Sequence, residues 1–156
     1  MTIGQEITLD EMTAEAADHL AVRIAEIDPW RRLAIPVDRI RWLFEAGHGS
    51  EVRAIQIGHR PVGAVVVQCN WLLGPYLQHL SVLPEAQARG AGTLALAWLE
   101  EIARQDHQSN IWLCVSAFNC QARAFYARHG FVETATLPDL IRPGEDEILI
   151  RRRLEA

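Results

Sequence analysis

The most informative segment of this chain is Ser81-Val82-Leu83-Pro84-Glu85-Ala86-Gln87-Ala88-Arg89-Gly90-Ala91-Gly92-Thr93. It predicts a strand that ends before a proline, then a loop with two glycines, then the start of a helix. The first amides of a helix lack intrahelical acceptors and carry a partial positive charge. Glycine also lets the backbone approach a bound anion closely. The segment therefore predicts a strand–loop–helix unit that can hold a pyrophosphate.

Two other kinds of phosphate site do not match this loop. A nucleotide P-loop needs GxxxxGK[ST], whereas all 15 basic residues of this chain are arginine. The dinucleotide fingerprint GxGxxG is absent as well. By themselves, Gly90 and Gly92 are equally consistent with a plain glycine turn. Gln87 and Arg89 favour the anion site, because both side chains can donate hydrogen bonds to phosphate.

The flanking patterns predict one mixed α/β (α+β) domain over residues 1–156. Apolar residues recur at helical spacing after Thr13, which suits an N-cap, and before Gly130, which suits a helix end. The expected elements are strand 3–9, helix 14–27, a helix from Pro36 to Gly47, strands 52–57, 62–70 and 76–83, helix 92–105, strand 111–115, helix 120–129, and strands 131–137 and 148–152 joined by the 138–147 connection. The order β-α-α-β-β-β-α-β-α-β-β predicts a largely antiparallel sheet with helices on both faces.

Composition excludes several classes of protein. The chain has 156 residues, of which 49% are hydrophobic and 22% charged, as in a soluble globular domain. No apolar run reaches the ~18–20 residues that cross a bilayer, and the N-terminus lacks secretory features, so we expect a cytoplasmic protein. The net charge of −5 argues against nucleic-acid binding. The cysteine and histidine spacings match neither a disulfide framework nor a metal site, and the apolar surroundings of two of the three cysteines predict buried thiols. Trp42, Trp71, Trp98 and Trp112 are expected in the core.

Two segments resemble the signatures of the GNAT superfamily, the GCN5-related N-acetyltransferases. Gln87-Ala88-Arg89-Gly90-Ala91-Gly92 is similar to (Arg/Gln)-x-x-Gly-x-(Gly/Ala). Asn119-Cys120-Gln121-Ala122-Arg123-Ala124-Phe125-Tyr126-Ala127-Arg128-His129-Gly130-Phe131 is similar to Asn-x-x-Ala-x-x-Phe-Tyr-x-x-x-Gly-Phe. Both stand in the family's order, and the resemblance extends over essentially the whole chain. It implies an acetyl-CoA-dependent N-acetyltransferase, with a GNAT-like sheet in which a parallel strand pair splays apart to hold the cofactor.

The resemblance also implies which residues contact acetyl-CoA. The splayed strands would be 76–83 and 111–115, and the pantetheine arm would pair with the backbone of Leu80 and Val82. Asn119 would contact the arm as well as cap a helix, although the cap alone explains this residue adequately. The pyrophosphate would lie on the amides of Gln87, Ala88, Arg89, Gly90, Ala91, Gly92 and Thr93.

Tyr126 is the catalytic residue that the resemblance implies. Its phenol would protonate the departing thiolate, and the two groups have comparable pKa values. The alternative is a core tyrosine packed beside Phe125. A backbone amide near Val82 could polarise the thioester carbonyl.

The general base is not identified by any motif. Our leading hypothesis is a water chain held by backbone carbonyls and Gln78, which shares a strand face with Tyr76. His79 has suitable chemistry but lies on the other face, so we favour a packed or edge-exposed histidine. Glu45 and His48 could also reach the site, although a surface position is the simpler interpretation for both.

Acceptor specificity is expected from two segments. Trp30 could line an acceptor pocket and Asp28 could bind an ammonium, or they could simply follow a helix end. The acidic 138–147 connection suits a cationic amine but is equally an ordinary solvated loop. Small amines, amino-sugar antibiotics, polyamines and peptide or protein amines all stay open as acceptors, whereas RNA is disfavoured.

Two functions compete with acetyl transfer. One is a non-catalytic acyl-CoA-binding sensor or regulatory module, which would keep the loop without needing Tyr126. The other is a phosphate-binding domain for a different nucleotide. A homodimer through exposed strands of the C-terminal half is a further expectation, by analogy with the family.

Overall fold

The computed structural model describes residues 5–45 and 47–155, which form two compact units. Unit 1 comprises the chain up to Val67 together with His79–Trp98, and unit 2 comprises Gln68–Gln78 together with the chain from Leu99 onward. Within the described ranges, no helix is long and apolar enough to cross a membrane.

The secondary structure follows the predicted order, with one short 3-10 helix added. The sheet order is β1-β2-β3-β4-β5-β7-β6, in which β4 and β5 are parallel. The pairs β1–β2, β5–β7 and β6–β7 are antiparallel, so the predicted mixed and largely antiparallel sheet is confirmed. The elements are β1 (Ile7–Glu11), α1 (Ala14–Ala25), α2 (Val37–Leu43), β2 (Ser50–Ile57), β3 (Arg60–Gln68), β4 (Tyr76–Val82), η1 (Pro84–Ala86), α3 (Ala91–Gln105), β5 (Asn110–Ser116), α4 (Cys120–Arg128), β6 (Val132–Arg142) and β7 (Glu145–Arg153).

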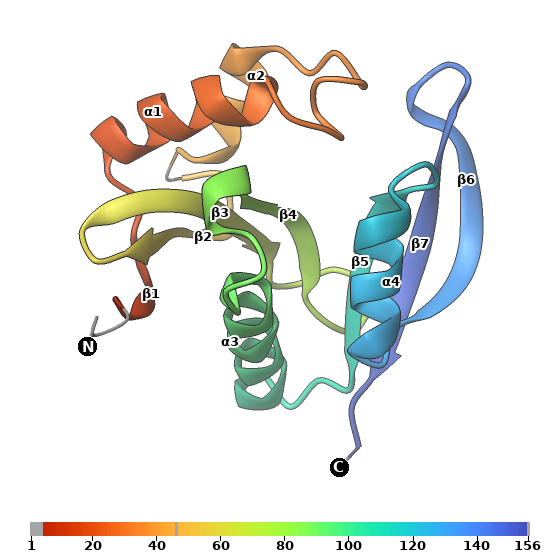
Figure 1. The fold of residues 1–156 in the computed structure, drawn as a ribbon. Helices are drawn as coiled ribbons and strands as arrows, with labels where there is room; N and C mark the ends of the chain where they lie inside the picture. The colour runs from red at the N-terminus through yellow and green to blue at the C-terminus, as the bar shows by residue number, and fades with distance from the viewer. Residues whose placement is uncertain (1–4, 46, 156) are drawn as a thin grey trace. The chain divides into compact units, whose positions relative to one another are not determined.

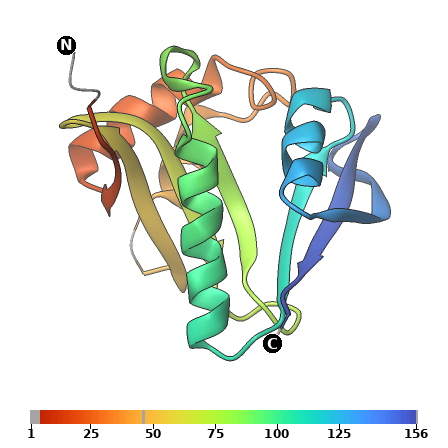
Figure 2. The same ribbon diagram turned by 60° about the horizontal axis from the view of Figure 1, so that its bottom comes forward.

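Unit 1 has helices on both faces of β2 and β3. Helices α1 and α2 lie on one face, and the first half of α3 lies on the other (Figures 1 and 2). Helix α1 begins where predicted, because Thr13 Oγ1 accepts a hydrogen bond from the amide of Ala16. One apolar cluster joins α1 and α2 to Ala64 and Val66 of β3. A second joins β2 to Ala91, the first residue of α3.

Strand β4 lies very close to β3 at Gly63. A Cβ placed on Gly63 would lie 2.1 Å from the carbonyl oxygen of Ser81, so only glycine fits. The amide of Leu83 donates to the carbonyl of Val62, which turns residue 83 toward β3. Backbone groups alternate along an antiparallel strand, so those of Val82 and Leu80 turn toward the opposite edge of β4.

Replacing Gly63 by alanine is expected to destabilise the fold by about 3 kcal/mol, because the backbone of β4 must move away from β3. For a domain of this length that corresponds to a melting temperature about 6–12 °C lower. Thermal denaturation followed by circular dichroism measures the change. Gly47→Ala is the comparison and should cost less, about 1–2 kcal/mol, because its φ of +99° strains an alanine but the added methyl group meets nothing within 4 Å. Equal losses for both variants would show that the approach of β3 and β4 is not tight.

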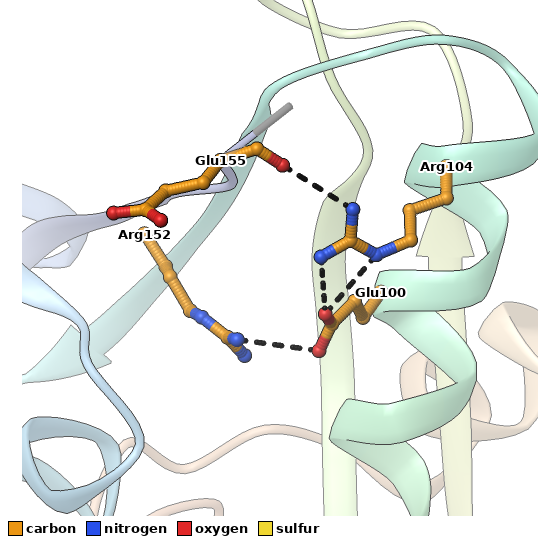
Figure 3. A network of polar contacts seen from close by, with 4 residues as sticks. All are labelled: Glu100, Arg104, Arg152 and Glu155. Carbon is orange, nitrogen blue, oxygen red and sulfur yellow. Dashed lines mark hydrogen bonds and ion pairs between the residues drawn. The ribbon is translucent and has the colours of Figure 1, made fainter.

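Unit 2 contains β5, β7, β6 and the start of β4, with α4 alongside β5 and β7 (Figures 1 and 2). The second half of α3 is tied to β7 by an ion-pair network around Glu100 (Figure 3). Arg104 donates to Glu100 Oε1 at 2.9 Å, and Arg152 Nη2 lies 3.2 Å from Glu100 Oε2. Arg104 also donates to the carbonyl of Glu155 at 3.3 Å, which holds the last described residue against α3.

Several predicted boundaries were wrong for local reasons. Helix α2 ends with Phe44 as its C-cap, and Gly47 lies beyond the helix. The hairpin turn between β2 and β3 consists of Gly58 and His59 alone, so Arg60 and Pro61 belong to the strand. Strand β6 continues through Pro138 to Arg142, because a register irregularity after Leu137 accommodates the proline. The expected 138–147 connection is therefore mostly a β-hairpin.

Several tryptophans and two cysteines are less buried than predicted. Trp42 and Trp71 are 45% and 47% exposed, whereas Trp112 is buried as predicted. Trp98 is half-buried under the guanidinium of Arg53, which lies 5.3 Å from its ring. Cys69 and Cys114 are half-buried and Cys120 is exposed.

Candidate active site

The loop before α3 has the backbone geometry of an anion cradle. Ala88 and Gly90 have φ of +60° and +88°, so the chain takes the left-handed conformation twice in three residues. The first intrahelical hydrogen bond of α3 runs from the amide of Leu94 to the carbonyl of Gly90. The preceding amides of Ala91, Gly92 and Thr93 therefore belong to the N-terminal turn of a 15-residue helix. Residues 87–90 are exposed, as access for a phosphate group requires.

Two side chains hold this loop in place from within unit 1. Arg23 makes a two-pronged ion pair with Glu85, at 2.9 and 3.0 Å, and this hydrogen-bonded guanidinium lowers the pKa of Glu85. Glu85 is thus an anchor for η1, although its side chain stays exposed. Gln87 Nε2 donates to the carbonyl of Val82 at 3.0 Å. One amide hydrogen of Gln87 therefore holds the loop against β4, and a contact of this side chain with phosphate stays a prediction.

Unit 2 contains Tyr126 and Asn119 on one helix. Tyr126 is 8% exposed, and its ring contacts those of Phe125 and Phe131 with centroids 5.2 and 5.7 Å away. Burial raises the pKa of Tyr126, which keeps the phenol protonated but makes it a weaker acid than an exposed tyrosine. Asn119 Oδ1 accepts from the amide of Ala122 at 3.1 Å, so its predicted role as an N-cap is confirmed. Contacts of either side chain with acetyl-CoA stay predictions.

The other residues considered as bases in unit 1 have structural roles. His79 is buried between Trp30 and Phe44, with ring centroids 5.0 and 5.3 Å away, and its Nε2 lies 2.8 Å from Ser81 Oγ. Burial lowers the pKa of His79 to about 3, so the imidazole is neutral at physiological pH and packed in the interior, as we favoured. Glu45 lies at the surface, 3.7 Å from Arg41 Nη1 and 3.7 Å from His48 Nε2.

The residues expected near the acceptor amine, or near the water chain that would activate it, are Trp30, Tyr76 and Gln78, and they fall in both units. In unit 1, Trp30 is half-buried and packs on His79 and the α1–α2 cluster. In unit 2, the ring of Tyr76 lies 4.9 Å from that of Trp71, and Gln78 Oε1 accepts from Gln68 Nε2 at 2.8 Å. In the tip of the β6–β7 hairpin, Asp139 Oδ1 accepts from the amide of Gly144. The acidic residues of that segment are thus part of a structured hairpin.

One polar cluster of unit 2 has no counterpart in the sequence motifs. Tyr76, Cys114, Ser116 and Glu147 come from three adjacent strands, β4, β5 and β7, and Ser116 pairs directly with Glu147. Ser116 Oγ donates to Glu147 Oε1 at 2.9 Å, and the neighbouring side chains of Tyr76 and Cys114 influence each other's pKa values. We predicted Glu147 only as part of an acidic connection. The apolar pattern that continues through Ile148 and Ile150 could have indicated that this strand begins before residue 148 and includes Glu147.

Comparison with known proteins relates the chain to one family. The model of the acetyltransferase (GNAT) family matches residues 15–131. An uncharacterised N-acetyltransferase of Methanocaldococcus jannaschii is 33% identical over 99 residues, which is 63% of each chain. This chain thus spans less than two thirds of that relative.

Two solved structures share the fold. The ribosomal-protein-S18-alanine N-acetyltransferase of Escherichia coli superimposes with a TM-score of 0.75 at 22% identity, covering 97% of this chain and 96% of the other. An acetyltransferase of Bacillus anthracis, solved in complex with acetyl coenzyme A, gives a TM-score of 0.63 at 19% identity over 70% and 65% of the two chains.

Proposed function

Since this chain belongs to the GNAT acetyltransferase family, we propose that it transfers the acetyl group of acetyl-CoA directly to a primary amine. The observation that carries the proposal is the loop before α3, where two left-handed residues lead into a helix N-terminus. That geometry suits a pyrophosphate, because amides and the helix dipole both favour negative charge. Together with the family match, it favours coenzyme A over other phosphate ligands.

We assign cofactor binding to three sets of groups. The amides of residues 87–93 would bind the pyrophosphate, and the side chain of Arg89 lies exposed beside them. The backbone edges of Leu80 and Val82, which turn away from β3, would pair with the pantetheine arm. At Val82 the N–H group is the one assigned to the pantetheine arm, because the carbonyl of Val82 already accepts a hydrogen bond from Gln87. Asn119 would add a polar contact beyond its cap.

The proposed reaction requires two protons to leave the acceptor. Acetyl-CoA supplies an activated thioester. An alkylammonium with a pKa near ~10 must first lose a proton to become a nucleophile, and its nitrogen loses a second after attack. Tyr126 would protonate the thiolate as the carbon–sulfur bond breaks and then regain a proton. The net products are the acetylated amine, coenzyme A and one proton released to solvent.

Several finer assignments stay predictions. The acceptor class is one of them. The similar Escherichia coli enzyme is named for acetylating an alanine of a ribosomal protein, and the amine of an alanine is its α-amino group, so this likeness favours an N-terminal peptide amine. A cytoplasmic location, the homodimer and the role of Trp30 are others. The alternative function is an acyl-CoA sensor, which would bind the cofactor without turnover.

A thermal melt in the presence of acetyl-CoA, coenzyme A or ATP tests the proposal. Acetyl-CoA at about one hundred times its dissociation constant is expected to stabilise the protein by ~2.7 kcal/mol, or about 5–10 °C. ATP at the same concentration is expected to give no shift. Thiol release in the presence of a panel of amines then separates enzyme from sensor. The absence of any shift with acetyl-CoA would make the loop an ordinary glycine turn and end the proposal.

A further inference from the structure

Glu147 is a buried carboxylate with half of its hydrogen-bonding capacity unused. The residue is 4% exposed and lies in the middle of the sheet of unit 2, paired with Ser116 on β5 and Leu137 on β6. Oε1 accepts from Ser116, whereas Oε2 is buried and has no hydrogen-bond partner among the described residues. Leaving such an oxygen unpaired costs free energy, which a bound donor would offset.

The surroundings of Glu147 suit a cation. Strand register places Trp112, Cys114 and Ser116 on one face of β5, with Tyr76 beside Trp112 on β4. Arg151 also belongs to this face, but its guanidinium lies over the ring of Trp112, 5.6 Å from the centroid. A carboxylate near aromatic rings is the combination that recognises ammonium groups.

The aromatic part of this face reaches the surface. Trp71 is 47% exposed, and its ring lies 4.9 Å from Tyr76 and 5.6 Å from Trp112. Cys114 and Tyr76 are themselves only half-buried. These rings therefore offer an exposed apolar surface on which the hydrocarbon part of an amine can pack.

We propose that Glu147 Oε2 binds the ammonium of the acceptor and removes its first proton. This inference rests on the proposed acetyl transfer. The ammonium nitrogen gives one proton to the carboxylate, which becomes the neutral acid, and the free amine attacks the thioester carbonyl. Glu147 then passes its proton to solvent and is ready for another cycle.

The electrostatics of the cluster agree with this role. Burial raises the pKa of Glu147, although the hydrogen bond from Ser116 partly opposes the shift, and a higher pKa makes the carboxylate a better base. The titratable groups that face it are Tyr76 on β4, Cys114 on β5 and Glu145 on β7. Tyr76 and Cys114 both have raised pKa values and are neutral, and β6 contributes the apolar Leu137.

A binding experiment tests the amine site without acetyl-CoA. The probe is benzylamine, with benzyl alcohol as its neutral isostere, and the readout is the carboxyl carbon signal of Glu147 in a nuclear magnetic resonance titration of the wild-type protein. We expect benzylamine to move this signal and benzyl alcohol to leave it in place. Equal responses to both probes, or no response to either, would overturn the proposal.

Two variants complete the binding test. Glu147→Gln keeps the oxygen that accepts from Ser116 but removes the charge, and benzylamine should bind it at least ten times more weakly. Asp146→Asn loses the same charge from an exposed neighbour on the opposite strand face, and its affinity should equal that of the wild type. Equal weakening in both variants would mean that general charge, and not Glu147, attracts the amine.

Turnover separates this inference from the proposed function. In the wild type, kcat/KM for the amine should rise with pH as Glu147 ionises, and E147Q should lose this dependence together with at least a hundred-fold in rate. Benzylamine binding without thiol release for any amine would end the proposed transfer but leave the amine site standing. Transfer by E147Q at the wild-type rate and pH profile would overturn the role of Glu147 while the transferase stands.

Discussion

Tyr126→Phe is expected to lower kcat for acetyl transfer by about a hundred-fold or more, because the departing thiolate would lose the proton donor that we propose for it. Phenylalanine keeps the ring, so the contacts with Phe125 and Phe131 persist. The melting temperature and the affinity for acetyl-CoA should therefore stay close to those of the wild type. Steady-state thiol release and a cofactor titration measure the two effects separately.

The chain has one other tyrosine, which provides a matched comparison. Tyr76→Phe removes a hydroxyl beside Cys114 and keeps the ring, so its kcat should fall far less than that of Y126F. If Y126F retains wild-type kcat, the phenol is a packing group and the acid must be sought elsewhere. If Y126F instead loses cofactor affinity, the hydroxyl supports binding and not proton transfer.

Gly90→Val is expected to weaken acetyl-CoA binding by at least ten-fold. Gly90 has a φ of +88°, which a β-branched residue adopts only with strain. The loop must then change course, and each charge-assisted hydrogen bond to the pyrophosphate that it loses costs about 1.5–3 kcal/mol, or ten-fold or more. Calorimetric titration with acetyl-CoA measures the affinity.

The control for this variant places valine at another glycine with a positive φ, which lies outside the loop before α3. Gly47→Val lies in the same unit at a φ of +99°, with nothing within 4 Å of an added Cβ. It should reduce stability by a similar amount and leave cofactor affinity intact. Unchanged affinity in G90V would show that the pyrophosphate lies outside this loop.

The elements around the loop were predictable from sequence because strong local signals coincide there. Pro84 ends a strand, glycines provide the turn, and Asn119 and Thr13 are helix caps whose side chains accept the expected amides. The two signatures then relate these local features to a known fold. Local and tertiary preferences agree at such positions, so the prediction needs no knowledge of distant contacts.

What escaped prediction depends on contacts between distant residues. Glu147 looked like one of several acidic loop residues, because its burial follows only from pairing with Ser116, 31 residues earlier. Trp71 has an apolar sequence context but is half-exposed, since it packs edgewise on neighbouring rings. Strand β6 runs past Pro138 because an irregularity in its pairing with β7 accommodates the proline, and nothing in the local sequence indicates that.

The close approach of β3 and β4 at Gly63 bears on how this protein could be redesigned. The course of β4 is set there by two main chains in contact and not by the sizes of the side chains around it. Exchanging side chains on β4 should therefore alter which molecules are accepted without shifting the amides assigned to the cofactor. Residue 63 is the exception, because any residue larger than glycine at this position pushes β4 itself away from β3. A combinatorial library for new acceptors should vary residues 76 and 78 and keep codon 63 fixed.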